Sequence, residues 1–472
     1  MNTGKDVMTK LGRRGLLMVV VLLAGCTVGP DYHAPKINAG NGWSAGGFAA
    51  QGKAGQMGWW HGLHDHELDR LIDLALSSNP DLLAAQARIA QARAARDAAL
   101  GLQAPQLQAA ASVNQLRQSE NGLMPLAEIP IIPRDATIYD AEFDASWEID
   151  LFGGTRRRIE SAKALQAASI ASAEDLRESL IAEIVRDYVS LRGEQIELTA
   201  RQASIATLDA EIGLLRQRAT NGDVPPYTLY PLTLQREDNA AAVPVLQARM
   251  RALALSLGVL SGQLPESELG LLNQPGKELN LMPIPVGERA EVLKRRPDVR
   301  VAERQLAAAT ADIGVATSAW FPQLAISASA GYQALNPGEL WASTSQTGSI
   351  MPLISWRLLD GGQIKAEIHA AKARQASAAQ VYVKAVLGAL GDAEQSLSNY
   401  HYALSSVDSE RTAQHAAQLD ADMAQARFKA GDIPRQDWLA TELVLDNAQT
   451  TLAVTYTQAA VAMVALHRAL GG

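Results

Sequence analysis

The sequence is poor in the features that mark several common protein classes. It has 472 residues and a single cysteine, Cys26, so no disulfide can form within one chain. Aromatic residues make up only 5% of it, and no run approaches the length of about 18 apolar residues that marks a transmembrane helix. Acidic residues outnumber basic ones, 50 to 42, and give a net charge of −8. This balance argues against nucleic acid, whose binding requires a basic face.

Motifs of the common enzyme classes are also missing. The sequence contains no G-x-S-x-G elbow, no P-loop and no H-E-x-x-H helix. His61, His64 and His66 lie close together, but their spacing lacks a firm metal-ligand pattern and no cysteine accompanies them. A surface turn is the simpler interpretation of these histidines. We therefore expect no catalysis, no metal and no other cofactor.

The first residues have the layout of a secretory signal. A positively charged stretch precedes the apolar residues 15–23, and the small residues Ala24 and Gly25 follow. Leu23-Ala24-Gly25-Cys26 resembles the lipobox of bacterial lipoproteins, which implies cleavage before Cys26, a diacylglycerol on its thiol and an acyl chain on its amine. An incidental cysteine at the end of an ordinary signal is the alternative. Thr27 stands where an aspartate would oppose sorting to the outer membrane.

The chain contains an internal repeat. Pro80-Asp81 recurs 217 positions later as Pro297-Asp298, and Pro105-Gln106-Leu107 recurs at the same shift as Pro322-Gln323-Leu324. Further on, "DLFGGTRRR" is echoed by "LLDGGQIKA", and "RATNGDVPP" by "RFKAGDIPR". Motifs that recur at the same spacing over long segments indicate an internal duplication. Each half has a helix, two strands, a long helix, a tight turn and a helix.

These landmarks divide the chain into four parts. We expect a lipoprotein signal peptide, an extended segment and two repeats, at residues 1–25, 26–58, 59–270 and 271–472 respectively. The long helices carry a seven-residue apolar period at Ile184, Leu191, Leu198, Ile205 and Ile212, and again at Leu390, Leu397 and Leu404. This period favours coiled-coil packing, although a plain helical bundle would show it too.

Four segments alternate with the period of two that is typical of strands, at about residues 106–117, 137–150, 322–334 and 347–359. In 137–150 one face is apolar and presents Tyr139, Phe143 and Trp147, whereas the other presents Asp140, Glu142, Asp144 and Glu148. The lengths suit tilted membrane strands, with the acids facing water and the apolar face lipid. Trp147 and Trp356 fall near strand ends, where aromatic side chains meet the membrane interface.

Four strands are too few to close a membrane barrel. The smallest outer-membrane barrels have eight, and an open sheet edge in lipid leaves backbone groups unpaired. The sequence therefore predicts a barrel that is shared between chains.

At this point the sequence resembles the outer-membrane factors of bacterial tripartite efflux pumps, the TolC-like channels, in the lipoprotein branch called NodT-type. The matching stretches are residues 59–94, "FDASWEIDLFG" at 143–153, "RRPDVRVAERQLAAA" at 295–309, "FPQL" at 321–324 and "DGG" at 360–362. These stretches occur in the family's order, and the resemblance covers nearly the whole mature chain.

The resemblance implies a mainly α fold with a β-barrel. Three chains would give four strands each to one twelve-stranded barrel in the outer membrane, and their long helical hairpins would form a periplasmic tunnel. It also implies partners: outer-membrane lipid, a periplasmic adaptor (membrane fusion protein), and an inner-membrane pump of the RND or MFS type. The channel itself would conduct small molecules passively and without ATP.

The resemblance also places a gate. Gly222-Asp223-Val224-Pro225 and Gly431-Asp432-Ile433-Pro434 join pairs of long helices, and in the family such turns lie at the periplasmic tip. We expect Asp223, Asp432, Arg435 and Asp437 to line this aperture. Asp437 fits an acidic ring, but Ala440 stands where the family often has another acid. Solvated residues at a helix start are the alternative.

Two other functions compete with small-molecule efflux. The same fold can serve as the outer-membrane channel of a type I polypeptide secretion system, and a lipid-tethered coiled coil could be a structural envelope protein. The lipobox and the NodT-like motifs favour efflux over secretion, and the four amphipathic strands argue against a purely structural role.

Overall fold

The computed structural model describes residues 27–36, 39–40, 42–44, 58–119, 134–281 and 283–472. The expected signal peptide at 1–25 and the anchor residue Cys26 lie outside these ranges. The elements follow in the order η2 (Trp59–Leu63), α2 (His66–Ser78), α3 (Pro80–Gly101), β1 (Gln106–Arg117), β2 (Asp135–Ile149), α4 (Gly154–Thr220), η4 (Pro226–Leu229), α5 (Tyr230–Leu260), η5 (Pro265–Asn273), α6 (Arg289–Arg295), α7 (Pro297–Ser318), β3 (Gln323–Ala334), η6 (Pro337–Glu339), η7 (Ser343–Ser345), β4 (Gln346–Ser355), α8 (Gln363–Ala430) and α9 (Arg435–Ala469).

The duplication is visible in the lengths of these elements. Helices α3 and α7 both begin at a proline and both have 22 residues, while α4 and α8 have 67 and 68. Proline suits the first position of a helix because the amide it lacks would have no partner there. Asn79 and Asp298 accept hydrogen bonds from backbone amides at the starts of α3 and α7.

The chain forms two compact units, and neither coincides with one repeat. The first unit comprises residues 1–35, 90–168 and 302–381, and the second comprises 36–89, 169–301 and 382–472. Each unit therefore draws segments from both halves of the sequence. The boundary between repeats at 59–270 and 271–472 stays a prediction from the sequence.

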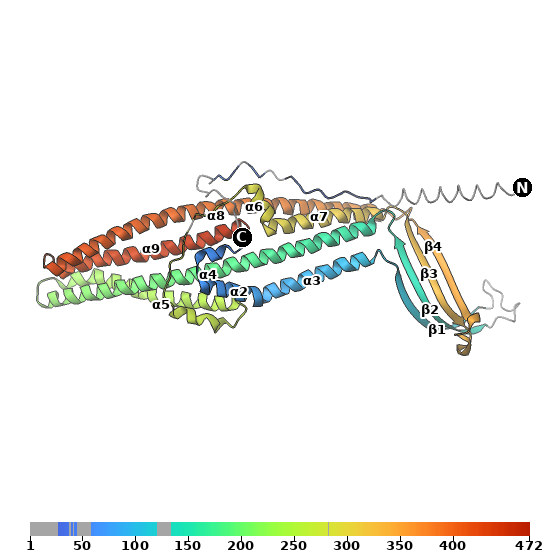
Figure 1. The fold of residues 1–472 in the computed structure, drawn as a ribbon, viewed down its shortest axis with the longest axis horizontal. Helices are drawn as coiled ribbons and strands as arrows, with labels where there is room; N and C mark the ends of the chain where they lie inside the picture. Colours follow the sequence, from blue (N-terminus) through green and yellow to red (C-terminus); the bar gives the residue numbers. More distant parts are fainter. Residues whose placement is uncertain (1–26, 37–38, 41, 45–57, 120–133, 282) are drawn as a thin grey trace. The chain divides into compact units, whose positions relative to one another are not determined.

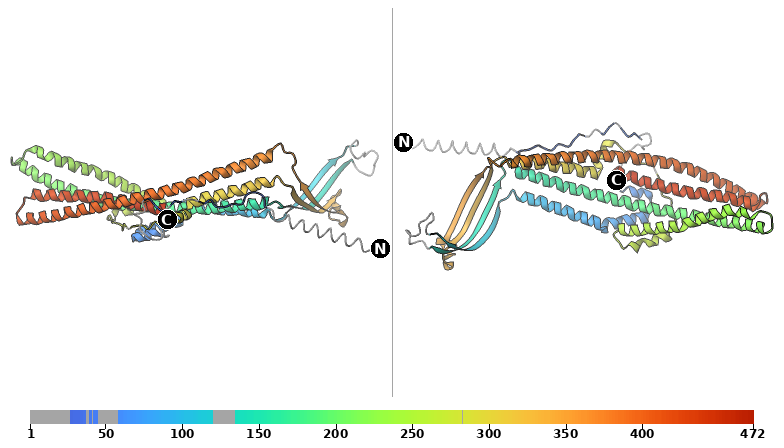
Figure 2. Two further views of the ribbon diagram at one scale, coloured as in Figure 1. Left: turned by 90° about the horizontal axis from the view of Figure 1, so that it is seen from above. Right: turned by 180° about the vertical axis from the view of Figure 1, so that it is seen from behind.

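The first unit contains one antiparallel four-stranded sheet in the order β1-β2-β3-β4 (Figure 2). Its register pairs Leu107 with Ala145, Phe143 with Ala330, and Ala328 with Ile350. Directly opposed residues in an antiparallel sheet share a face, so most apolar positions lie on one side, with Met351 and Leu353 of β4 as exceptions.

The fourth strand is shorter than the expected 347–359 and ends at Ser355. Its last partner is Gln323, the first residue of β3. The alternation of apolar residues continues past this point in the sequence, but β3 offers no further backbone to pair with. Trp356 and Leu358 therefore follow the strand rather than belong to it.

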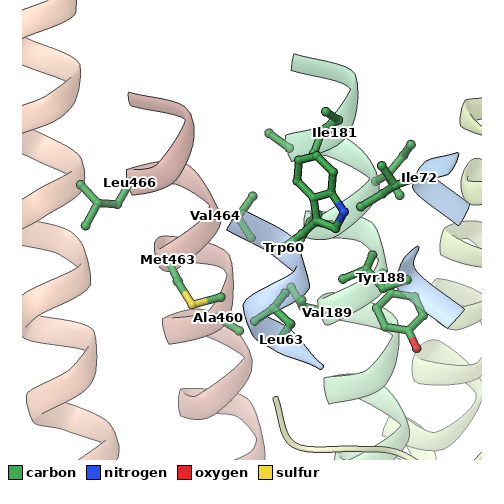
Figure 3. Close-up of a cluster of buried hydrophobic side chains, with 14 of the residues drawn as sticks. Trp60, Leu63, Ile72, Ile181, Tyr188, Val189, Ala460, Met463, Val464 and Leu466 are labelled. Atoms are coloured by element: carbon green, nitrogen blue, oxygen red, sulfur yellow. The ribbon is translucent and has the colours of Figure 1, made fainter. Parts of the chain in front are cut away.

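The second unit is helical and has a core built from α2, α4, α5, α8 and α9. Figure 3 shows part of this core, with Trp60 and Ile72 beside Ile181 of α4, and Met463 and Val464 contributed by α9. Its largest fully buried side chain is Tyr188. The predicted seven-residue seam lies in this region: Ile184 and Leu191 are fully buried.

Among the residues that the structure describes, one helical stretch, Pro226–Leu260, is long and apolar enough to cross a membrane. Here Met250 and Leu257 of this stretch join the helical core, and Ser256 donates a hydrogen bond to Asp187 of α4 at 2.7 Å. These contacts are those of a helix packed within the second unit.

Candidate functional site

One face of the sheet is mainly polar on β1, β2 and β3, while β4 contributes Met351 and Leu353 to it beside Thr347 and Ser349. Asp140, Glu142, Asp144 and Glu148 lie on this face of β2, as expected, opposite mainly polar or small residues of β1 and β3. Gln333 donates a hydrogen bond to Asp140 at 2.7 Å, and the Ser329 and Ser349 hydroxyls lie 2.9 Å apart. This mainly polar surface suits contact with water, and the acids give it negative charge.

The opposite face is apolar and open in the single chain. It carries bulky side chains among many alanines, and Phe143 and Ile350 are 59% and 79% exposed. The remaining bulky members are Leu107, Val113, Tyr139, Trp147, Ile149, Leu324, Ile326, Tyr332 and Ile354. A sheet face with this many exposed apolar side chains is typical of a binding surface or a membrane-facing surface. A polar face backed by a lipid-compatible face is the pattern of a membrane-barrel wall.

The two strand-end tryptophans make the same contact in each repeat. The Trp147 indole donates a hydrogen bond to the Gln103 carbonyl, and the Trp356 indole donates one to the Trp320 carbonyl, both at 3.0 Å. Gln103 lies two residues before the proline that precedes β1, and Trp320 lies two residues before the proline that precedes β3. Each indole therefore ties a strand end to the neighbouring helix-to-strand junction. The position of these rings at a membrane interface stays a prediction.

An aspartate caps the start of each long helix. Asp150 accepts hydrogen bonds from the Thr155 and Arg156 amides, and Asp360 accepts them from the Gly362 and Ile364 amides. Side-chain oxygens here satisfy amides that have no partner within the helix. The glycine pairs that follow the strands are thus strand-to-helix bends, as the sequence predicts.

The two expected tip turns have the same backbone geometry. Gly222 and Gly431 have φ values of 83° and 82°. In each turn the residue after the glycine donates its amide to a carbonyl near the helix end, Asp223 to Arg218 and Asp432 to Arg427, both at 2.9 Å. This is the pattern in which a glycine ends a helix in the left-handed conformation.

Arg435 and Asp437 lie in the first turn of α9 and are exposed, as are Asp223 and Asp432. In the described part of the chain these four residues form no ion pair with one another. Their exposure leaves them available to another chain or to an ion. Their role at an aperture remains a prediction.

Two contacts at the turns are not apparent from the sequence. Arg218 at the end of α4 donates a hydrogen bond to the Gln436 side chain at 2.5 Å, which links the two hairpins. Phe428 and Trp438 stack across the second turn with ring centroids 5.2 Å apart. Arg218 and Gln436 are 218 residues apart, so no local pattern marks them as partners.

The motif "RRPDV" builds a polar site in the second unit. The Arg296 side chain donates to both carboxylate oxygens of Asp298, to Asp392, and to the carbonyls of Ala389 and Ala469. Burial raises the pKa of Asp298, but the hydrogen bonds and charge of Arg296 outweigh it, so that pKa lies below its usual value.

A cavity of about 410 Å³ adjoins Arg296 and is also lined by Asp175, Glu178 and Arg468. Burial, and then repulsion from Asp298, raise the pKa of Asp175. These acidic and basic side chains stabilise the packing of the helices around the cavity. They supply no nucleophile paired with a base, which acyl- or phosphoryl-transfer chemistry would need.

The clustered histidines are not brought together as a metal site. The His61 ring lies 2.7 Å from an Asp69 carboxylate oxygen, and His64, directly after η2, has a φ of 52°. Over the ranges that the structure describes, no group of three or more His, Cys, Asp or Glu side chains is arranged to hold a metal ion.

Comparison with known proteins agrees with this geometry. The family model "Outer membrane efflux protein" matches residues 71–229 and 289–472. Outer membrane protein OprJ of Pseudomonas aeruginosa is 26% identical over 97% of this chain and 95% of its own. Nodulation protein T of Rhizobium leguminosarum bv. trifolii is 28% identical over 92% of this chain and 90% of its own.

The solved structure of the outer-membrane channel OprN covers 95% of this chain and 99% of its own, with 31% identity and a TM-score of 0.83. The predicted TolC-like fold and the resemblance to NodT-type channels are thereby confirmed. So are localisation to the outer membrane and the role of channel component in an efflux system. The chain belongs to the outer membrane efflux protein family.

Proposed function

We propose that three copies of the chain assemble into one outer-membrane conduit for small molecules. In the described sheet β1 and β4 are the two edges, and both would leave backbone groups unpaired in lipid. Pairing β4 of one copy with β1 of the next removes every edge. Three copies give twelve strands, which exceeds the minimum of eight. The two-faced sheet with open edges is the observation that carries this proposal.

The conduit does no chemistry of its own. Its polar face, with the acids of β2, would line a water-filled lumen, and its apolar face would meet lipid. A periplasmic adaptor and an inner-membrane pump of the RND or MFS type would supply both substrate and energy. The acyl groups on Cys26 would add a second attachment to the membrane, since lipid anchoring is stable only with more than one chain.

The gate lies in the two tip turns. Asp437 would occur three times around the axis of a trimer, and close carboxylates repel one another unless a cation or a base such as Arg435 offsets their charge. The exposure of Asp223, Asp432, Arg435 and Asp437 supports this assignment.

Single-channel recordings test the gate. Asp437→Ala and Arg435→Ala should alter the resting conductance or the block by divalent cations. Asp408→Ala is the matched control, because Asp408 is an exposed acid of α8 about 35 Å along the helix from Gly431. An aperture elsewhere is indicated if the tip variants behave like the control.

Native mass spectrometry in detergent tests the assembly, and a drug-susceptibility panel on a deletion strain tests the function. We expect a mass of three chains, and a rise in susceptibility that the wild-type gene reverses. A stable folded monomer contradicts the shared barrel. Unchanged susceptibility together with loss of an exported polypeptide would instead indicate secretion.

A further inference from the structure

The cavity beside Arg296 lies where four segments of the second unit meet. Its walls come from α4, the start of α7, α8 and the end of α9. The Arg296 side chain fixes one wall through its bonds to Asp298, Asp392 and two backbone carbonyls. The volume of about 410 Å³ lies within the range of about 300–1,000 Å³ that is usual for small-molecule sites.

The duplication places an equivalent joint in the first repeat, between the start of α3 and the end of α5. There the Asn79 side chain donates a hydrogen bond to the Leu260 carbonyl at 2.9 Å, as Arg296 donates one to the Ala469 carbonyl at 3.1 Å. The two donors are 217 residues apart and the two acceptors 209, which are the separations of the Pro-Asp motifs and of the tip-turn glycines. The same joint is thus built with an asparagine in one repeat and an arginine in the other.

Two equivalent glycines show that the second joint is the more open one. A Cβ added to Gly262 in the first joint would lie 2.4 Å from the Ser78 carbonyl oxygen. The nearest atom to a Cβ added to Gly471, 209 residues later, lies at 3.5 Å. The second repeat therefore has room at this joint that the packing of two helix ends does not require.

Three charged side chains of the cavity lack a full set of partners. Within the described chain Asp175 of α4 accepts no hydrogen bond, and Arg468 of α9 forms no ion pair and acts on Asp175 through charge alone. Glu178 accepts one bond at 3.1 Å, from its neighbour Arg177. Burial raises the pKa of both Asp175 and Glu178, as expected of carboxylates whose charge is poorly compensated.

The lining carries more negative than positive charge. It contains four acids and two arginines: Asp175, Glu178, Asp298, Asp392, Arg296 and Arg468. Asp298 and Asp392 are bonded to Arg296, so Asp175 and Glu178 remain for cations and Arg468 for an anion. Over the described ranges the acids are not arranged to hold a metal ion. An organic ligand with two positive groups and one negative group complements the three remaining side chains.

We propose that this cavity is a binding site for a basic amino acid. The two ammonium groups of the ligand donate to Asp175 and Glu178 of α4, and its carboxylate accepts from Arg468 of α9. Charge-assisted hydrogen bonds of this kind are among the stronger polar contacts in proteins. The bound ligand bridges α4 and α9 and stabilises the folded unit as its occupancy rises. This site is separate from the conduit and its gate, so its failure leaves the proposed function untouched.

Isothermal titration calorimetry of the full-length protein in detergent at neutral pH tests the site with three matched probes. L-lysine carries all three charged groups, L-norleucine lacks the second ammonium group, and cadaverine lacks the carboxylate. We expect lysine to bind about 10-fold more tightly than either of the others, because each of them loses one charge-assisted hydrogen bond. Equal affinities of the three probes, or no binding of lysine, overturn the proposal.

Variants distinguish this site from the other acids of the protein. Asp175→Asn should weaken the binding of lysine and of cadaverine about 10-fold, whereas Arg468→Gln should weaken lysine to the same extent but not cadaverine. Asp408→Asn and Arg251→Gln are the matched controls, because they change exposed residues of α8 and α5, and both should bind lysine as the wild type does. Arg468 is itself exposed, so its variant stays informative if Asp175→Asn fails to fold. Lysine affinity that Arg468→Gln or a folded Asp175→Asn leaves unchanged overturns the proposal.

Discussion

Replacement of Arg296 by alanine should weaken the helical unit more than any single surface change. The arginine side chain is buried, and its five hydrogen bonds reach two carboxylates and two carbonyls of α8 and α9. Loss of the side chain leaves Asp298 without the positive charge that holds its pKa down, and leaves the carbonyls of Ala389 and Ala469 short of a donor. Groups left unpaired in this way carry their full desolvation cost.

The size of the effect follows from exposure. Removal of one partner from a buried ion pair costs about 3–5 kcal/mol. The Asp298 and Asp392 side chains are 36% and 65% exposed, and water screens part of their interaction, so we expect the low end, about 3 kcal/mol. For a unit of this size that corresponds to a fall in Tm of roughly 5 °C. Arg296→Lys should recover less than half, because an ammonium group cannot bind a carboxylate in the two-point manner of a guanidinium.

Thermal unfolding followed by circular dichroism in detergent measures this difference. The control is Arg300→Ala in the next turn of α7, where an ion pair with Glu174 joins side chains 42% and 44% exposed. Such exposed pairs contribute about 0–1 kcal/mol. The reasoning about Arg296 is refuted if its alanine variant unfolds within a degree or so of the control.

The pH dependence of the same variant supplies an independent check. The pKa of Asp298 is lowered in the folded state, so its contribution is present above the usual aspartate pKa near 3.8 and is lost as the pH falls through the lower folded value. Without Arg296 this contribution is gone. The variant should therefore lose less stability than the wild type on acidification below pH 4.

Three further outcomes are expected. Trp356→Phe should keep most of the apolar contact but lose the hydrogen bond to the Trp320 carbonyl, which lowers the free energy of unfolding by about 1 kcal/mol. An unchanged Tm in thermal unfolding would contradict a stabilising role for this hydrogen bond. Burial against Trp59 lowers the pKa of His467 to about 4, so stability should fall by roughly 3 kcal/mol as the pH drops from 6.5 to 4, because only the unfolded chain takes up the proton. His467→Phe should flatten that decline, and an equally steep profile would count against it. Glu142→Gln should reduce the cation preference of the channel in planar bilayers at low salt, whereas Glu266→Gln, which removes the same charge from η5, should not.

Side-chain periodicity predicts the sheet well because both faces of a membrane strand are chemically defined. Along β2 the side chains alternate between a polar face and an apolar face. The sequence alone therefore assigns faces to the acids Asp140, Glu142, Asp144 and Glu148 and to the Phe143 ring. The end of β4 could not be predicted in this way. It depends on where β3 begins, at Gln323, and that is a property of the partner strand.

The tip and the amino-terminal segment show a second limit. The glycine turns at Gly222 and Gly431 have a local signature, since each needs a positive φ and a following proline. The link from Arg218 to Gln436 has none, because its partners meet only when two hairpins are packed. Likewise, nothing in the sequence near Gly314 indicates that it must lack a side chain; the reason is that the Arg157 side chain and the Val28 carbonyl lie where its Cβ would be.

The duplication helps to decide which contacts belong to the fold and which are special to one half. The strand-end tryptophans and the helix-starting aspartates recur in both repeats, which identifies them as parts of the common framework. Arg157, whose buried guanidinium donates hydrogen bonds to the Val28 and Gly29 carbonyls, has no such counterpart. Aligning the glycine pairs that follow the strands places Lys365 at its position in the second repeat, and Lys365 is exposed where Arg157 is buried. The amino-terminal segment occurs only once, so only one of the two repeats has a residue that must bind it. A buried arginine at one of two equivalent positions is therefore better explained by its bonds to this segment than by the needs of the helix start.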